Sequence, residues 1–419
     1  MSTIAHKNRL GILVAGGPSP GINSVISAAT IRSLVEGVEV VGILDGFKHI
    51  MRGDISHIRE LTVDMVSRIH FLGGSFIGIA RDNPTRDPKL LDAAVQSLLR
   101  LDIDKLITIG GDDTAFTAMK VEEKAAGRIH VVHVPKTIDN DLDLPQGIST
   151  FGFQTARQIG FDIVKNLMVD ARTTSRWFFV VMMGRKAGHL AVNVSKAAGN
   201  TLTLIPEEFP NGALVPMRRL VDIIAGSIIK RLAYGTQDGV AILAEGLLDK
   251  MPIEDLKALG HVEKDAHDNI RFDELDFGGI MKREVQKRLG QFGIKTTIVA
   301  KNIGYELRCG DPIAYDIEYT RDLGYHAADT LLNGGTAVMV SEQNHRLVPI
   351  PFAEMVDPQT GRTRIRMVNT SSDAFQVLQG FMIRLTQEDL DDPSECAKYA
   401  SVAGISIEEF QQEFSDAVL

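Results

Sequence analysis

The chain has 419 residues, of which 44% are hydrophobic and 24% are charged, and its formal net charge is −9. This composition is that of a globular protein long enough for two packed domains. The acidic balance argues against a nucleic-acid partner, two cysteines cannot form a disulfide framework, and no run reaches the roughly 18 apolar residues of a membrane span. We therefore expect a cytoplasmic protein with neither nucleic acid nor membrane as its partner.

Short apolar runs alternate with helical patterns along the chain. We predict helices up to Leu34 and from about Ala115 to Ala126, and strands at Leu10–Ala15, Val38–Leu44, Leu106–Ile109, Ile129–Val134, Trp177–Met182 and Gly239–Ala244. The charged stretch Lys250–Arg288 predicts a helical insertion with a mobile loop at His261–Asn269. The tail after Ser371 has helical apolar spacing at Phe375, Leu378, Phe381 and Leu385. Buried strands separated by helices predict an α/β fold with mostly parallel sheets covered on both faces.

Glycines and charged residues follow five of these strands. The segments concerned are Gly16-Gly17, Gly110-Gly111-Asp112-Asp113, Pro135-Lys136-Thr137, Met183-Gly184-Arg185 and Glu245-Gly246. Ligands of such sheets gather beyond the carboxyl ends of the strands. Five strand ends of this kind therefore predict one ligand-binding cleft.

The segment Gly16-Gly17-Pro18-Ser19-Pro20-Gly21 joins the first predicted strand to a helix. Glycines let backbone N–H groups approach an anion, and a helix N-terminus favours negative charge. A tight turn without a ligand is the alternative. The segment matches neither the Walker loop nor G-x-G-x-x-G.

The segment Gly110-Gly111-Asp112-Asp113-Thr114 offers two adjacent carboxylates at a backbone turn. Hard oxygen ligands suit Mg²⁺, so Asp112 is the candidate metal ligand, through water. Helix capping by Asp113 or Thr114 is the alternative.

The segment Thr137-Ile138-Asp139-Asn140-Asp141 presents two carboxylates that would point to the same side of an extended chain. One could accept a proton from an attacking hydroxyl while the other serves the metal. Lys136 beside them could clamp a transferring phosphoryl group. The alternatives are a solvated acidic loop and an ordinary surface lysine.

Arginines supply the remaining candidates, because their guanidinium groups bind phosphate in a bidentate manner. They are Arg185 after a strand, Arg308 and Arg176, each of which could instead be a surface residue. We interpret His70, His133 and His189 as structural, and we find no His/Cys spacing suited to zinc.

These motifs resemble the phosphofructokinase family along nearly the whole chain, and its pyrophosphate-dependent branch in particular. The matching segments, in the family's order, are Gly110–Thr114, Pro135–Asp141, Met183–Arg185, Ala244–Gly246 and Gly304–Arg308. The resemblance implies two Rossmann-like domains with the active site in the interdomain cleft. Residues 1–150 with about 307–365 would bind the donor, and 151–306 with about 366–419 would bind the sugar phosphate and carry C-terminal helices.

The resemblance also implies roles for individual residues. The reaction would pass a phosphoryl group from pyrophosphate to the 1-hydroxyl of fructose 6-phosphate, reversibly, with Mg²⁺ on Asp112. Asp139 would accept the proton with Asp141 assisting, and Lys136 would stabilise the transition state. Donor contacts would come from Gly17, Arg81 and Gly111. Sugar-phosphate contacts would come from Thr137, Ile138, Asp139, Met183, Gly184, Arg185, Glu245, Tyr305, Arg308 and, from a neighbouring subunit of a homodimer or homotetramer, Arg176.

The choice of donor depends on Asp113 and Lys136, because family members that use ATP usually have glycine at both positions. An α-phosphate about 4 Å from the Asp113 carboxylate would be repelled by on the order of 4 kcal/mol at an effective dielectric constant of about 20. That repulsion corresponds to roughly a thousandfold in affinity. Pyrophosphate lacks the additional group, so this pair of residues predicts pyrophosphate as the donor.

Two alternatives stay open: an ATP-dependent 6-phosphofructokinase, and a pyrophosphate-dependent kinase that prefers sedoheptulose 7-phosphate. Kinases of NAD or lipid and a non-catalytic sugar-phosphate sensor fit the motifs less well. The chain departs from the family at Val299, where a spacing match expects an arginine for the sugar phosphate, and at Tyr305, which replaces a histidine.

Overall fold

The computed structural model describes residues 8–144, 147–210, 212–259, 275–357, 359 and 363–418. The chain forms two compact units, one of Met1–Ala156 with Tyr305–Arg366 (unit 1) and one of Arg157–Gly304 with Met367–Leu419 (unit 2). Each unit is thus built from two separate stretches of sequence. The assignment of one domain to the donor and the other to the sugar phosphate stays a prediction.

Unit 1 contains a seven-stranded sheet of order β11-β10-β5-β4-β1-β2-β3. The five central strands run parallel, and β3 and β11 pair antiparallel at the two edges. The strands are β1 (Arg9–Val14), β2 (Glu39–Ile43), β3 (Ile58–Glu60), β4 (Lys105–Gly110), β5 (His130–Pro135), β10 (Val338–Gln343) and β11 (Arg346–Pro351).

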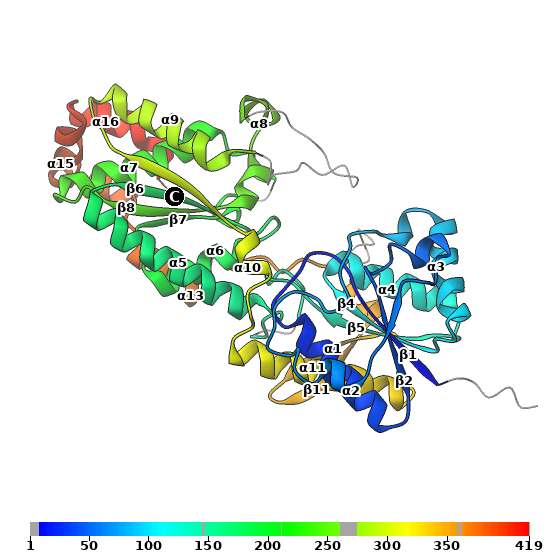
Figure 1. Ribbon diagram of the computed structural model, residues 1–419. Coiled ribbons are helices and arrows are strands. Elements are labelled where there is room, and N and C mark those ends of the chain that lie inside the picture. Colours follow the sequence, from blue (N-terminus) through cyan, green and yellow to red (C-terminus); the bar gives the residue numbers. More distant parts are fainter. Residues whose placement is uncertain are drawn as a thin grey trace, which may run out of the picture. The chain divides into compact units, whose positions relative to one another are not determined.

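Helices cover both faces of this sheet (Figure 1). On one face lie α1 (Ile22–Val35) and α11 (Ala314–Leu332), and on the other lie α3 (Pro88–Arg100) and α4 (Asp112–Ala125). The short helices are α2 (Val63–Val66), α10 (Tyr305–Arg308) and α12 (Phe352–Met355). Along β1, Ile12 packs with the first pair of helices and Leu13 with the second, as the two-residue period of a strand requires. Both faces are buried, which explains the continuous apolar runs.

Unit 2 contains a four-stranded parallel sheet of order β7-β8-β6-β9. Its strands are β6 (Trp177–Met182), β7 (Leu202–Leu204), β8 (Gly239–Ala244) and β9 (Ile298–Ile303). Its helices are α5 (Phe153–Thr174, whose first turn belongs to unit 1), α6 (His189–Ala198), α7 (Met217–Ala233), α8 (Ile253–Leu259), α9 (Phe277–Gln291), α13 (Asp373–Phe381), α14 (Gln387–Asp391), α15 (Pro393–Ala403) and α16 (Ile407–Phe414).

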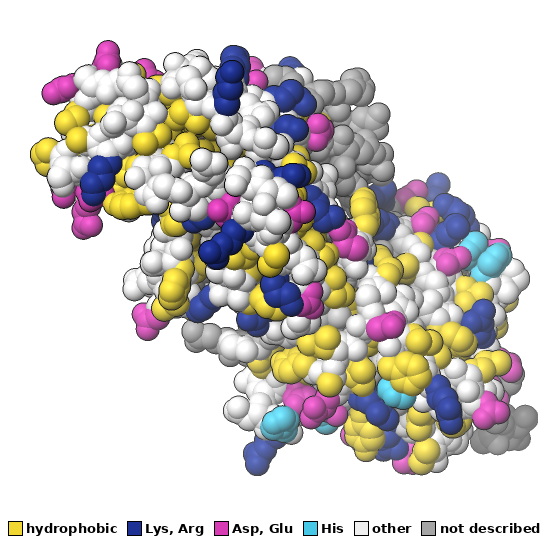
Figure 2. Space-filling model, turned by 60° about the vertical axis from the view of Figure 1, so that its left-hand side comes forward, with side chains coloured by type: hydrophobic (Ala, Val, Ile, Leu, Met, Phe, Trp, Pro, Cys, Tyr) yellow, Lys and Arg dark blue, Asp and Glu magenta, His cyan; other side chains and the backbone are white. Residues whose placement is uncertain are grey.

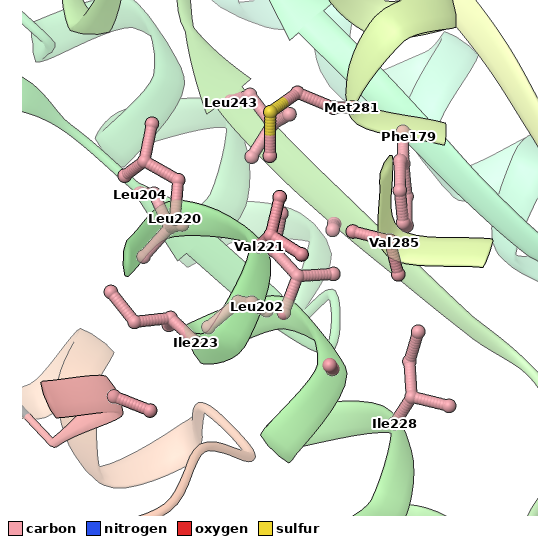
Figure 3. Packing of buried hydrophobic residues seen from close by; sticks show 14 of the residues in the cluster. Phe179, Leu202, Leu204, Leu220, Val221, Ile223, Ile228, Leu243, Met281 and Val285 are labelled. Atoms are coloured by element: carbon pink, nitrogen blue, oxygen red, sulfur yellow. The ribbon is translucent and has the colours of Figure 1, made fainter. Parts of the chain in front are cut away.

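Figure 3 shows how the core of unit 2 forms between its sheet and the helices α7 and α9. Phe179 and Leu243 from the strands lie with Val221 from α7 and with Met281 and Val285 from α9. Burying one such side chain contributes about 1.5–3 kcal/mol. Unit 2 therefore has a hydrophobic core of its own.

The predicted strands are all present, and the structure adds β3, β7, β9, β10 and β11, which are short or interrupted by polar residues. The predicted helix start at Ala115 was wrong: α4 begins at Asp112, directly after Gly111. The predicted apolar tail helix was wrong in part, because α13 ends at Phe381, which is 75% exposed, while Leu385 is buried beyond the helix end. The insertion is helical at α8 and α9, and the loop predicted at His261–Asn269 lies outside the described residues.

The surface carries charges of both signs. Figure 2 shows basic and acidic side chains interspersed with scattered hydrophobic ones over the face in view. Among the described residues, no helix is both long and apolar enough to cross a membrane.

Candidate active site

The carboxyl ends of three neighbouring strands of unit 1 bring the predicted donor segments to one edge of the sheet. Strand β4 pairs in parallel with β1 on one side and with β5 on the other. The backbone N–H of Ala15 donates to the Ile109 carbonyl at 3.0 Å, and that of Lys136 donates to the Gly110 carbonyl at 2.7 Å. The ladders thus continue into the segments that follow each strand, and these segments lie side by side.

The first glycine turn places cationic side chains next to a half-buried stretch of backbone. Gly16 has a φ of +91°, a conformation that favours glycine. A Cβ atom on Gly17 would lie 3.8 Å from Arg81 Nη2 and 3.9 Å from Arg308 Cζ. The Nζ of Lys136 donates a hydrogen bond to the Gly17 carbonyl. Three cations therefore surround a glycine turn, which is the charge distribution that an anionic ligand requires.

Lys136 is buried, at 4% exposure, so the alternative of an ordinary surface lysine was wrong. The pKa of Lys136 is lowered to about 8, mainly by burial and also by the charges of Arg308 and Arg81, while Asp139 and Asp141 act in the opposite direction. Lys136 is therefore close enough to these two arginines and two aspartates for their charges to change its pKa. A buried ammonium group held among them can respond to the charge of a bound ligand.

His133 supports the same strand ends from within the sheet. It is fully buried, its Nδ1 lies 2.8 Å from Thr108 Oγ1, and its Nε2 lies 3.1 Å from the Gly110 carbonyl oxygen. Burial lowers the pKa of His133 to about 3, so the ring is neutral. A carbonyl can only accept, so Nε2 carries the proton and Nδ1 accepts from Thr108. These contacts agree with the structural role predicted for His133.

The two aspartates after β4 lie in the first turn of α4. Gly111 occupies the N-cap position without a side-chain cap, and Asp112 and Asp113 follow it. Capping by Asp113 or Thr114 was therefore wrong as an alternative, because both residues lie inside the helix. Carboxylates at this end interact favourably with the helix dipole. Their hard oxygen atoms are also the ligands that Mg²⁺ prefers.

The loop after β5 bends where an extended chain was expected. Asn140 has a φ of +57°, so the prediction that Asp139 and Asp141 point to one side of an extended strand was wrong in its premise. The hydroxyl of Thr137 accepts a hydrogen bond from the Asp139 N–H at 3.1 Å, and Ile138 is buried. The chain thus turns at the two carboxylates.

In unit 2, the ends of β6 and β8 bring three predicted sugar-binding residues together. Glu245 Oε2 accepts a hydrogen bond from the Gly184 N–H at 3.3 Å, and the Gly246 N–H donates to the Gly184 carbonyl at 3.2 Å. The Met183 N–H donates to the Ile303 carbonyl at 3.0 Å. Gly184 has a φ of +140°, which explains the glycine at this position.

Arg185 belongs to the same turn. Burial raises the pKa of the Asp249 carboxyl, and Arg185 and Lys186 oppose that change. Both cations therefore lie close enough to Asp249 to interact with its charge.

Arg176 lies at the opposite end of strand β6 from Met183, because Arg176 precedes β6 and Met183 follows it. A strand of six residues spans about 20 Å. The Nε of Arg176 lies 3.9 Å from Asp170 Oδ1. The structure therefore does not bring Arg176 together with Met183, Gly184 and Arg185 within one chain.

The remaining positions singled out in the sequence are Arg308, Tyr305 and Val299. Arg308 and Tyr305 belong to unit 1, where the Arg308 guanidinium lies over the Tyr305 ring at 5.0 Å from its centroid. Val299 is the second residue of β9, paired with Phe178, and thus lies near the amino end of a strand rather than at its carboxyl end. The spacing match that expected a phosphate-binding arginine at this position therefore does not point to a strand end where the other site candidates lie.

Sequence reasoning missed a buried carboxylate in unit 2. Glu207 Oε1 accepts hydrogen bonds from the N–H groups of Gly188 at 2.9 Å and Val368 at 3.2 Å. Burial raises the pKa of Glu207, and these bonds oppose the rise. Glu207 follows β7, a strand of three residues that is too short to be recognised from the sequence, so no sequence motif indicated this carboxylate.

Sequence reasoning also missed a cluster of possible metal ligands. His49, Asp54 and His57 each place a ligand atom within 4.8 Å of the others. The two imidazole rings are parallel, with centroids 3.6 Å apart. Ring nitrogen lone pairs lie in the plane of each ring, so those of two parallel rings do not converge on one ion. We therefore assign no metal to this cluster.

The sequence of the chain is similar to those of known enzymes over almost its full length. It is 49% identical over 413 residues to the pyrophosphate--fructose 6-phosphate 1-phosphotransferase of Naegleria fowleri, covering 97% of this chain and 94% of that one. It is 48% identical over 411 residues to the enzyme of the same name from Thermotoga maritima, covering 97% and 98%.

The fold is similar to that of a solved phosphofructokinase from Pichia pastoris, with a TM-score of 0.65 and 19% identity. This likeness covers 98% of the present chain, which spans 39% of that longer chain. The family model described as Phosphofructokinase matches residues 9–331. The match contains β1, β2, β4 and β5 of unit 1, all four strands of the unit 2 sheet, and the glycine, aspartate and lysine segments that follow these strands, and on this ground the chain belongs to the phosphofructokinase family.

Proposed function

We propose that this chain transfers a phosphoryl group from pyrophosphate to the 1-hydroxyl of fructose 6-phosphate, reversibly, giving fructose 1,6-bisphosphate and phosphate. One structural observation carries the proposal. The buried Lys136 lies with Arg81 and Arg308 beside Gly17, within the electrostatic reach of Asp139 and Asp141. The two relatives above, alike over nearly their full lengths, carry this activity in their names.

The chemistry follows from the charges at this edge of the sheet. The oxygen of the sugar 1-hydroxyl attacks one phosphorus of pyrophosphate, the bridging P–O bond breaks, and phosphate leaves. Asp139 accepts the hydroxyl proton, with Asp141 assisting. Lys136 stabilises the charge on the transferring group, a contribution of about 2.7–4 kcal/mol where one such group has been removed from other enzymes. Gly17, Gly111 and Arg81 hold the donor through backbone and guanidinium N–H groups.

Enzymes of the phosphofructokinase family require a divalent metal ion, and we propose Mg²⁺ held by Asp112. The position of this carboxylate in the first turn of α4 supports the proposal. When bound, the ion neutralises negative charge on the donor oxygens. The other proposed roles, proton acceptance and charge stabilisation, belong to Asp139, Asp141 and Lys136.

Asp113 is proposed to exclude ATP. Its side chain is exposed in the first turn of α4, so water and salt screen it. The repulsion of an α-phosphate is therefore below the 4 kcal/mol or so that applies at an effective dielectric constant of about 20. We infer that Asp113 disfavours ATP and that Lys136, placed for the shorter donor, contributes the remainder of the preference.

The sugar phosphate is proposed to contact residues of both units. In unit 2 the turn of Met183 and Gly184 with Glu245 supports this assignment, because Glu245 fixes the backbone of the turn. The further proposed contacts are Thr137, Ile138, Arg185, Tyr305 and Arg308. An active site between the two domains stays a prediction.

Arg176 is proposed to act in trans, in a homodimer or homotetramer. Its place before β6, at the other edge of the sheet from Met183 and Gly184, supports a role in a neighbouring subunit's site.

An assay with two donors and two sugars tests the proposed function. The purified protein is incubated with Mg²⁺, with pyrophosphate or ATP, and with fructose 6-phosphate or sedoheptulose 7-phosphate. We expect turnover with pyrophosphate and fructose 6-phosphate and a much smaller kcat/KM with ATP. Turnover with ATP alone contradicts the donor assignment, and a higher kcat/KM for the seven-carbon sugar contradicts the acceptor.

A further inference from the structure

A second segment of unit 1 holds the loop that carries Asp139 and Asp141. Leu142 and Ile365 form an antiparallel bridge. The Arg366 N–H donates to the Asp141 carbonyl at 2.8 Å. More than 200 positions separate the two segments in sequence, as the Arg366–Asn140 separation of 226 shows. The loop is therefore fixed by a contact that forms only in the folded unit.

The Arg366 side chain makes three more contacts with the same loop. Its Nε donates to the Asn140 carbonyl at 3.0 Å, its Nη1 donates to the Ile148 carbonyl at 2.6 Å, and its Nη2 donates to Asn140 Oδ1. A planar guanidinium group can satisfy three acceptors at fixed angles, which a flexible ammonium group cannot do. Arg366 thus ties the two ends of the loop, at Asn140 and Ile148, to one rigid group.

Asn140 is the residue on which these contacts converge. Its φ of +57° lies in the left-handed region, which asparagine tolerates better than most residues but which still costs energy. Its Oδ1 also accepts a hydrogen bond from the Thr150 N–H at 3.0 Å. The Thr150 hydroxyl donates to the Thr137 carbonyl at 2.6 Å. The surrounding bonds therefore hold Asn140 in a conformation that the free loop would leave.

The positive charge of Arg366 interacts with carboxylates of the same loop. Burial lowers the pKa of Arg366, and the carboxylates of Asp141 and Asp143 oppose that change. The guanidinium group is thus a half-buried cation that interacts with Asp141, one of the two carboxylates proposed to act in the reaction.

We propose that Arg366 is a positioning residue for phosphoryl transfer, which holds the Asn140 backbone in its left-handed conformation and so fixes the places of Asp139 and Asp141. The inference rests on the proposed function, because it takes Asp139 as the proton acceptor. It assigns a role to a residue that acts through its contacts with the loop rather than on the reacting atoms. The observations that support it are the four hydrogen bonds from Arg366 and the φ of Asn140.

The first experiment compares Arg366→Met and Arg366→Lys with Arg364→Met. Arg364 lies two positions away on the same segment, and its side chain is half exposed, 3.9 Å from Asp143. We expect Arg366→Met to lower kcat about 100-fold, as a misplacement of about 1 Å does elsewhere, with KM for both substrates changed by less than about threefold. Arg366→Lys should recover part of kcat, and Arg364→Met should match the wild type.

A second experiment keeps the inference testable if Arg366→Met fails to fold. Asn140→Gly retains access to positive φ but removes the Oδ1 acceptor, and Asn140→Ala also disfavours the left-handed conformation itself. Both should lower kcat, with alanine the worse of the two. The double variant Arg366→Met/Asn140→Gly should lose less kcat than the product of the two single losses, because both changes remove the contact between Arg366 Nη2 and Asn140 Oδ1.

The outcomes separate the two proposals. A wild-type protein without turnover of pyrophosphate and fructose 6-phosphate contradicts the proposed function. An active wild type with unchanged kcat in Arg366→Met, or in Asn140→Gly, overturns the inference alone. Losses that multiply in the double variant also overturn it, because they would show that Arg366 acts by another route.

Discussion

The Lys136 ammonium group lies within reach of two guanidinium groups and two carboxylates, and this neighbourhood determines its chemistry. Without an anionic ligand, the three cations repel one another in a region of low dielectric constant. A bound anion relieves that repulsion and favours the charged form of the lysine. We therefore expect the charge of Lys136 to depend on whether the proposed donor is bound.

The lowered pKa of Lys136, about 8, predicts two effects of pH. The kcat/KM for pyrophosphate should fall as pH rises through about 8, because the free protein loses the ammonium charge.

In the unfolded chain the Lys136 ammonium group titrates at its ordinary pKa of 10.5, so the unfolded state binds more protons than the folded state between about pH 8 and 10.5. The free energy of unfolding should therefore rise with pH in this window, by up to about 1.4 kcal/mol per unit.

Denaturant unfolding at several pH values checks this prediction. The difference between wild type and Lys136→Met isolates the contribution of this group, and the variant should lose turnover by about 10²–10³-fold. A variant that reproduces the wild-type pH dependence of stability would contradict the buried, perturbed lysine.

Asp139→Asn should lower kcat by about 10²–10⁴-fold while binding of the sugar phosphate is largely kept, because the amide cannot accept the hydroxyl proton. Asp143→Asn is the control, since Asp143 is an exposed carboxylate of the same loop. Steady-state kinetics with binding measured by calorimetry distinguishes the two effects. Equal kcat in the two variants would remove Asp139 from its role.

Asp113→Gly should admit ATP weakly, because it removes only part of the barrier and leaves Lys136 in place for the shorter donor. The double variant Asp113→Gly/Lys136→Gly should admit more. Glu123→Gln on the exposed side of the same helix serves as the control. Inhibition and turnover by ATP are measured for each, and if ATP does not even inhibit the double variant, other residues exclude it.

At the scale of elements, a buried ion network joins α16 to α7 and α9 in unit 2. Arg288 is 5% exposed; its Nε lies 2.7 Å from Asp222 Oδ1 and its Nη2 lies 2.7 Å from Glu413 Oε2. The guanidinium also lies over the Phe292 and Phe414 rings, at 4.7 and 5.2 Å from their centroids. The network thus fixes the last helices of the chain onto the core of unit 2.

Arg288→Met should destabilise unit 2 by about 1–3 kcal/mol, because it removes one of the two arginines that pair with the buried Asp222 and leaves only Arg218, whose Nε lies 2.6 Å from Asp222 Oδ2. Arg283→Met is the matched control on the same helix, with a side chain 62% exposed, and should change stability by less than about 0.5 kcal/mol. The single tryptophan, Trp177, is fully buried in unit 2, so its fluorescence reports the unfolding of that unit. Equal midpoints in denaturant for both variants would contradict the role of the network.

At the scale of the whole molecule, two units each have a sheet and a hydrophobic core. Their proposed contributions differ, because the cation cluster around Lys136 lies in unit 1 and the turn of Gly184 with Glu245 lies in unit 2. Within unit 2, Arg176 lies at the opposite end of β6 from the turn of Gly184. Its proposed role therefore requires a second copy of the chain.

Mixing two inactive variants tests that role. Subunits with Arg176→Ala and subunits with Asp139→Asn should regain part of the activity when they are refolded together, because a mixed oligomer contains sites with both residues intact. The control pair of Arg185→Ala and Asp139→Asn should stay inactive. Arg185 and Asp139 are proposed to serve the site of their own chain, so every site of a mixed oligomer then lacks one of them. Absence of recovery in the first pair, with mixed oligomers confirmed by mass, contradicts action in trans.

Local patterns were sufficient for much of the fold. The apolar runs at Leu10 and Trp177 predicted buried parallel strands, because burial on both faces leaves continuous hydrophobic sequence. The glycines and charges after them marked the strand ends where the site residues lie. Strands such as β7, with three residues, were missed because so short a run carries no periodicity.

The sequence by itself determined the fold class, the family and the chemistry expected at the strand ends, because these depend on residue types and on spacings within short segments. Only the tertiary structure decided that Lys136 is buried, that Asn140 is left-handed and that Arg366 binds its loop. Burial and backbone conformation at these positions depend on groups far away in sequence, such as Arg308 and Arg366. The residues that neighbour these positions in sequence do not indicate such contacts. The surroundings of Lys136 and Asn140 could therefore be found only in the folded chain.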